Sequence, residues 1–165
     1  MKLIDWLQNW NLNSLKISAG FLDMELHFRD EDKAAAWELY VELLTRITTQ
    51  PLADHEGDEK TALASLHAIF GLTREIIKGN GPGCIEFTKI AIVVLNQVIR
   101  PFTAKWHRLA IAGAFADPAK CREFREELEI LQQKLRDYSG LLAAVAGVED
   151  LTRLEMQSWA REEML

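Results

Sequence analysis

The sequence predicts a mainly α-helical protein, a single-domain bundle of four main helices with short terminal helices and a small N-terminal β-hairpin. Three observations predict this fold. From residue 30 onward, apolar residues recur at steps of three and four, as in amphipathic helices. Strict alternation of apolar and polar residues occurs only within residues 15–28. The length of 165 residues, with 48% hydrophobic and 27% charged residues, suits one domain with its own core over 1–165.

The N-terminal segment carries two different patterns. Leu3, Leu7 and Trp10 lie at helical spacing, which predicts a short amphipathic helix over residues 2–10. Apolar and polar residues then alternate on both sides of Ala19-Gly20, which predicts a β-hairpin over 15–28. A lone two-stranded ribbon is marginal in water, so we expect this hairpin to pack against helices.

The first main helix is predicted over 31–48. The carboxylate of Asp30 or of Asp32 can cap its free N–H groups, and Trp37 lies on its predicted inward face. The helix should end before Pro51, where an acidic loop begins.

The second main helix is predicted over 59–78, and the glycine-rich turn 79–83 should end it. Because this turn is short, we expect the helix to pair antiparallel with the next helix about Gly81. That pairing would place His67 close to Leu95.

The third and fourth main helices have distinct signatures. The helix over 84–110 is apolar around most of its circumference, which is typical of a central helix, and Pro101 should kink it near residues 99–101. The helix over 118–146 begins at Asp117-Pro118, and a last short helix is predicted over 149–163. The helix over 118–146 carries an apolar heptad seam of Phe124, Leu128, Leu131, Leu135, Tyr138, Leu142 and Val145.

Charge and cysteine content narrow the function classes. The net charge of −6 gives the chain no general electrostatic footprint for nucleic acid, although it suits solubility or a basic partner. The two cysteines, Cys84 and Cys121, have no metal-ligand or redox spacing and indicate reduced thiols. No signal-peptide pattern occurs, and the apolar run over 90–95 is too short to span a bilayer. We therefore expect a cytoplasmic protein without a membrane partner.

A polar stripe on the predicted central helix is the leading ligand-site candidate. Glu86, Lys89, Asn96, Arg100 and His107 follow one another at steps that place them on one side of the helix. Buried polar groups must be paired or must face a cleft. The stripe therefore predicts either a structural network or a cleft for a small anion, nucleotide or peptide carboxylate. The candidate ligand-binding residues are His67, Glu75, Glu86, Lys89, Asn96 and Arg100.

No cofactor, metal site or catalytic residue is predicted. The four histidines lack HxH, HxxxH and HExxH spacing, and the acidic loop 54–59 lacks the ligand pattern of a calcium loop. No P-loop, GxGxxG or GxSxG motif occurs. Cys84 at a predicted helix start could be a reactive thiol, but a buried small residue is the favoured interpretation.

The segment from Arg100 to Arg108 mixes basic and aromatic residues and is the best nucleic-acid candidate in the chain. The alternative interpretation is a kinked helix whose Phe102 and Trp106 pack inward. The acidic balance of the chain and the absence of a known nucleic-acid-binding motif favour that alternative.

The leading functional hypothesis is a non-enzymatic module for protein–protein interaction or self-association, an adaptor in a larger bacterial system. The heptad seam, the five tryptophans and the lack of a catalytic signature support it. Trp6, Trp10 and Trp159 on the terminal helices are the candidate interface residues. The alternatives are a ligand-binding or catalytic domain that uses the polar stripe, and nucleic-acid contact through residues 100–108.

Overall fold

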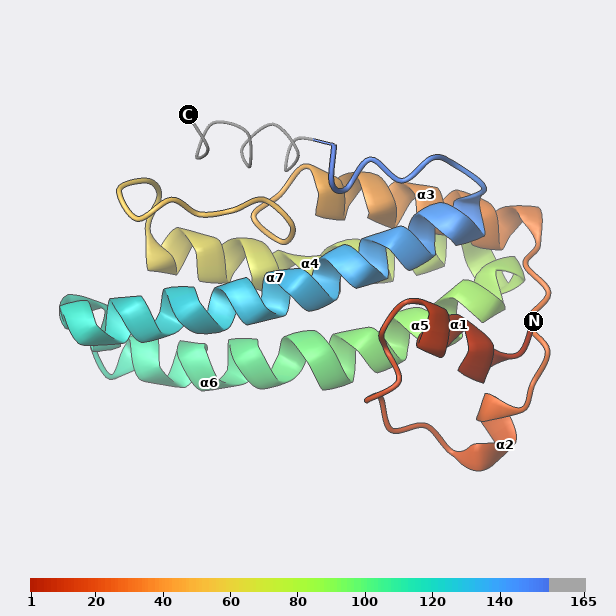
Figure 1. Ribbon diagram of the computed structural model, residues 1–165, viewed down its shortest axis with the longest axis horizontal. Helices are drawn as coiled ribbons and strands as arrows, with labels where there is room; N and C mark the ends of the chain where they lie inside the picture. Colours follow the sequence, from red (N-terminus) through yellow and green to blue (C-terminus); the bar gives the residue numbers. More distant parts are fainter. Residues whose placement is uncertain (155–165) are drawn as a thin grey trace.

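The computed structural model describes residues 1–154 and confirms the all-α class. Figure 1 shows α4, the run from α5 to α6, and α7 along the long axis of the molecule, with α3 against one half of α7. In that view the short helix α1 lies in front of α5, and α2 lies below α1 at the lower right. The α-helices are α1 (Leu3–Asn9), α2 (Ala19–Leu22), α3 (Asp30–Leu44), α4 (Glu59–Asn80), α5 (Ile85–Val94), α6 (Arg100–Ile111) and α7 (Pro118–Ala146).

Helix α7 forms the spine of the core. Every residue of its heptad seam, from Phe124 to Val145, is no more than 4% exposed. The Asp117 side chain accepts a hydrogen bond from Ala119 N at 2.9 Å, and Gly147 ends the helix with φ 72°. The seam faces α3 and α6 of the same chain, so it builds the core of this domain.

One buried carboxylate joins α3 to α5. Asp32 is 0% exposed and accepts the N–H of Arg29 at 2.8 Å, at the start of its own helix. Its other oxygen accepts the N–H of Phe87 at 2.9 Å, in the first turn of α5. Free N–H groups at helix starts favour negative charge, so this arrangement satisfies Asp32 without a cation.

The predicted helix over 31–48 is too long, because α3 ends at Leu44. The hydroxyls of Thr48 and Thr49 donate to the Leu43 carbonyl at 2.6 and 2.7 Å. These side chains satisfy a carbonyl that a continuing helix would bond through its backbone. Trp37 was expected to face inward and is instead 48% exposed.

The kink expected at Pro101 takes the form of a π-turn. Helix α5 continues through the π-helix η2 (Leu95–Ile99) into α6, and Arg100 N bonds the Leu95 carbonyl five residues back. Proline cannot donate the usual backbone hydrogen bond, and the wider turn accommodates its ring.

Helices α4 and α6 pack against each other, but the predicted register is wrong. Gly81–Cys84 form the 3-10 helix η1, and the chain reverses its direction after Gly81. The pairing is centred near residue 87, which places His67 beside His107 and far from its predicted neighbour Leu95.

The β-hairpin predicted over 15–28 does not form, since no strand occurs between residues 1 and 154. The side chain of Gln97 binds both backbone groups of Lys16, accepting from N at 2.8 Å and donating to O at 2.7 Å. The other half of the segment bonds the start of the chain, with an isolated antiparallel bridge between Lys2 and Glu25. The backbone groups that a second strand would bind are therefore bound by the Gln97 side chain and by the first residues of the chain.

The last predicted helix, over 149–163, is absent from residues 149–154: residues 149–151 have no regular structure and residues 152–154 form a turn. Its remainder lies outside the described residues. The stretch Glu59–Ile111 is long and apolar enough to cross a membrane by length and composition only. Core helices of globular proteins meet the same test, so this stretch is weak support for a membrane location.

Candidate functional site

The structure separates the six residues of the predicted ligand site. Lys89 Nζ pairs with Glu86 Oε1 at 2.7 Å, and Arg100 Nε donates to Asn96 Oδ1 at 3.0 Å. Both pairs lie within one helical run, and Glu75 is exposed on α4. Only His67 and Arg100 line the same cavity.

This cavity, which we name the basic hollow, lies between α4 and α6 and has a volume of about 360 Å³. His67 and Arg74 reach it from α4, and Arg100 and His107 reach it from α6. Its remaining walls consist of small, aromatic and hydroxyl residues, and no carboxylate lines it. These wall residues are Ala68, Phe70, Gly71, Thr103 and Ala104.

Arg100 is held at the basic hollow by two contacts. Its guanidinium carbon lies 4.7 Å from the ring centroid of Phe70, and its Nε donates to Asn96. Within residues 1–154, neither Arg100 nor Arg74 forms an ion pair. Both guanidinium groups can therefore donate to a ligand.

The two histidines of the basic hollow lie against each other, with ring centroids 4.9 Å apart. Burial lowers the pKa of His107, and the charge of His67 lowers it further. An anion in the cavity would oppose both effects, so its binding should favour protonation of His107.

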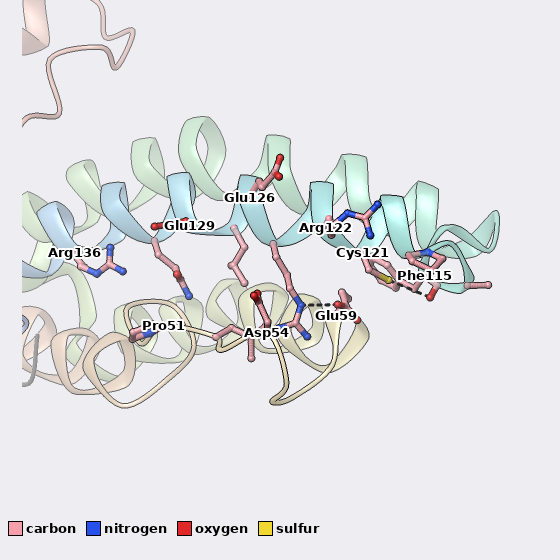
Figure 2. A pocket seen from close by; sticks show the side chains of 15 residues that line it. Pro51, Asp54, Glu59, Phe115, Cys121, Arg122, Glu126, Glu129 and Arg136 are labelled. Atoms are coloured by element: carbon pink, nitrogen blue, oxygen red, sulfur yellow. Dashed lines mark hydrogen bonds and ion pairs between the residues drawn. The ribbon is translucent and has the colours of Figure 1, made fainter. Parts of the chain in front are cut away.

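A second and larger cavity, the α7 groove, lies between α7 and the loop over 51–58 and has a volume of about 800 Å³ (Figure 2). Arg125 crosses it from α7 and donates to Glu59 Oε1 at 2.8 Å, as the dashed line in Figure 2 marks. The same guanidinium donates to the carbonyls of Ala53 at 2.8 Å and Glu56 at 3.3 Å. Arg125 therefore fastens the loop to α7.

Two further side chains of α7 hold the start of this loop. Gln132 Nε2 donates to the carbonyls of Ile47 and Gln50, both at 2.7 Å. Arg136 Nε donates to the Thr49 carbonyl at 3.2 Å. Burial, and to a lesser degree the charge of Arg153, lowers the pKa of Arg136.

The sequence prediction missed this groove, although a signal for it exists. Arg125, Glu129, Gln132 and Arg136 each follow one residue after a member of the heptad seam. A polar stripe that runs beside a buried seam lies at the edge of the core, where it can contact another segment.

The aromatic residues of the segment over 100–108 belong to the hydrophobic core. Phe102 and Trp106 are buried, and Trp106 Nε1 donates to Glu127 at 2.9 Å. Lys105 pairs with Glu123 at 3.3 Å and also with Glu127. The rings of Phe102 and Trp106 are therefore unavailable for stacking on bases.

The candidate interface tryptophans also pack on the protein itself. Trp6 meets Phe28 edge-on with centroids 5.1 Å apart, and Trp10 lies over Gly140 of α7. Trp159 lies outside the described residues.

Neither a reactive Cys84 thiol nor a metal-ligand cluster gives a site among residues 1–154. Cys84 is buried, and its thiol contacts the Gly81 carbonyl at 3.2 Å. No cluster of three or more histidine, cysteine or carboxylate side chains there could hold a metal ion.

No family model, curated protein or solved structure matches this chain. Functional inference therefore depends on the geometry of the two cavities.

Proposed function

We propose that this chain is a helical binding module that takes a phosphate group in the basic hollow. The observation that carries the proposal is the convergence of four basic side chains from two helices, with no carboxylate among the lining residues. This occurs in a chain whose net charge is −6, so the positive charge is local. A concave site lined by one sign of charge concentrates the opposite ion.

The chemistry of the donors favours phosphate over a simple carboxylate. A phosphate monoester carries nearly two negative charges and three strong acceptor oxygens, which suit donors that arrive from several directions. Arg74 and Arg100 offer forked donors on opposite helices, and His67 and His107 offer ring nitrogens. The volume of about 360 Å³ falls at the small end of the range for ligand sites.

The interaction-module hypothesis has less support than the sequence suggested. The heptad seam is buried inside the domain, and Trp6 and Trp10 pack against it or its neighbours. An adaptor role and a cytoplasmic location stay predictions.

Calorimetric titration with inorganic phosphate and adenosine monophosphate at low salt tests the proposal. Arg100→Gln and Arg74→Gln should each weaken binding by about tenfold or more, the usual effect of losing a charge-assisted hydrogen bond. Arg108→Gln is the matched control, because Arg108 is exposed on α6 and does not line the hollow. Its affinity should stay within about twofold of the unaltered protein.

Three results would overturn the proposal. One is no heat of binding at millimolar phosphate. Another is an equal loss of affinity in Arg108→Gln and Arg100→Gln. The third is binding of a single-stranded oligonucleotide that falls steeply with salt and depends on Arg108, which would favour nucleic-acid contact instead.

A further inference from the structure

The α7 groove contains a buried cation, Arg136, that forms no ion pair within residues 1–154. Arg136 is 7% exposed, and its Nε and Nη1 bond only neutral oxygens, those of Thr49 and Gln133. Within residues 1–154, no carboxylate oxygen lies within 4.0 Å of its guanidinium, and Nη2 has no hydrogen-bond partner. A buried charge is costly unless it is paired, so this end of the groove favours an anion.

The carboxylates near Arg136 are engaged or solvated. Asp137 pairs with Arg153 at 3.5 Å, and Glu129 is exposed at the rim of the groove. Arg125, the other large cation, is already neutralised by Glu59. Arg136 is therefore the buried charge that a ligand in the groove could match.

The guanidinium is also held in place before any ligand arrives. Its bond to Thr49 and the two bonds from Gln132 to Ile47 and Gln50 fix α7 against the start of the loop. Figure 2 shows the Arg136 side chain at one end of the groove, and its dashed line marks the hydrogen bond that Glu59 accepts from Arg125 further along the groove. A donor fixed in this way loses little entropy on binding.

Between these two arginines, apolar residues of the loop and of α7 line part of the groove, beside the polar side chains of Glu126, Glu129 and Gln132. Pro51, Leu52 and Leu128 line the groove there, along about 16 Å of α7 by the helical rise. These apolar residues suit a hydrocarbon body. The lining carboxylates Asp54, Glu126 and Glu129 repel a doubly charged ligand more strongly than a singly charged one.

We propose that the α7 groove binds an organic monocarboxylate, with its carboxylate on Arg136 and its apolar body along Pro51, Leu52 and Leu128. The site is separate from the basic hollow, which lies between α4 and α6 and shares no lining residue with it. The proposal therefore stands or falls independently of phosphate binding.

Titration with 4-phenylbutyrate and with its neutral amide, followed by calorimetry and amide NMR, tests this site. The acid should bind at least about tenfold more tightly than the amide, because only the acid pairs with the buried guanidinium. The largest shift changes should occur at Leu52, Leu128 and Gln132. Equal affinities for acid and amide, or shift changes confined to His67 and His107, would overturn the proposal.

Variants provide a second comparison. Arg136→Gln should abolish the preference for the acid, whereas Arg122→Gln, an exposed residue beyond Arg125 in the same groove, should retain it. Arg100→Gln should bind the acid unchanged, which separates this site from the proposed phosphate site. Because Arg136 also holds Thr49, the variant can loosen the loop, and the acid–amide comparison in the unaltered protein is then decisive.

Discussion

At the scale of single residues, Tyr138 is fully buried, and its hydroxyl has no hydrogen-bond partner within residues 1–154. Its side chain is 2% exposed, and burial raises its pKa. We predict that Tyr138→Phe leaves the free energy of unfolding unchanged or raises it by up to about 1 kcal/mol. Tyr138→Ala should lower it by about 3–5 kcal/mol through the cavity it leaves.

Urea denaturation of both variants measures these free energies. A loss of more than about 1 kcal/mol in Tyr138→Phe would show that the hydroxyl has a partner in solution.

His107 should make stability depend on pH. Since burial lowers its pKa in the folded state, the unfolded chain binds more protons as pH falls through the ordinary histidine range. The stabilising contribution of neutral His107 is present above about pH 6.5 and declines below that value. We predict that His107→Gln loses less stability between pH 8 and pH 5 than the unaltered protein.

Denaturant midpoints measured across this pH interval test the prediction. His55→Gln, in the exposed loop over 51–58, is the control and should keep the full pH dependence. Identical profiles for His107→Gln and the unaltered protein would contradict the role assigned to His107.

At the scale of helices, the packing of Trp10, the residue that follows α1, against α7 requires glycine at position 140. A Cβ at Gly140 would lie 2.5 Å from Cζ3 and 2.8 Å from Cε3 of Trp10. Gly140→Ala should lower the free energy of unfolding by about 1–3 kcal/mol from overpacking, partly offset by about 1 kcal/mol of helix propensity. Trp10 should also become more exposed to solvent, which tryptophan fluorescence and quenching measure.

Gly79 in α4 is the matched control for this prediction. A Cβ there meets no atom within 4 Å, so Gly79→Ala should be neutral or stabilise by about 0.5–1 kcal/mol. Equal destabilisation by both variants would show that the Trp10 contact is not the cause.

The same scale explains why the predicted hairpin failed. Alternation over 15–28 predicts one buried and one exposed side. Leu26 is buried as that pattern predicts, whereas Met24, on the same predicted side, is 38% exposed. Alternation does not say which group completes the backbone hydrogen bonds. The side chain of Gln97, distant in sequence, completes them for Lys16.

At the scale of the whole molecule, a single core links α3, α6 and α7, so we expect one cooperative unfolding transition. Leu135 is 0% exposed, whereas Ile130 on the same helix is 62% exposed. Leu135→Ala should lower the free energy of unfolding by about 2–5 kcal/mol, and Ile130→Ala should change it by less than about 0.5 kcal/mol.

Circular dichroism and fluorescence followed through one denaturant series test both claims. Transitions that do not coincide would indicate separate units. A large loss in Ile130→Ala would indicate that this exposed face is covered in solution, as self-association requires.

The candidate site was predictable only in part. His67 and Arg100 were expected to belong to one ligand site, and they do line one cavity. Their companions Arg74 and His107 depend on the register of α4 against α6, which η1 and the π-turn set. Arg136 could not be assigned, because its surroundings come from a loop more than eighty residues away.

The sequence by itself determined the helical class, the start of α7 at Asp117-Pro118 and the buried seam from Phe124 to Val145. Periodicity and capping act within a few residues, so they can be read locally. The tertiary structure alone decided the helix register, the binding of Lys16 by Gln97, and the two cavities. Those features depend on contacts between side chains and backbone or charged groups that are distant in the sequence. Such contacts form only when the whole core packs.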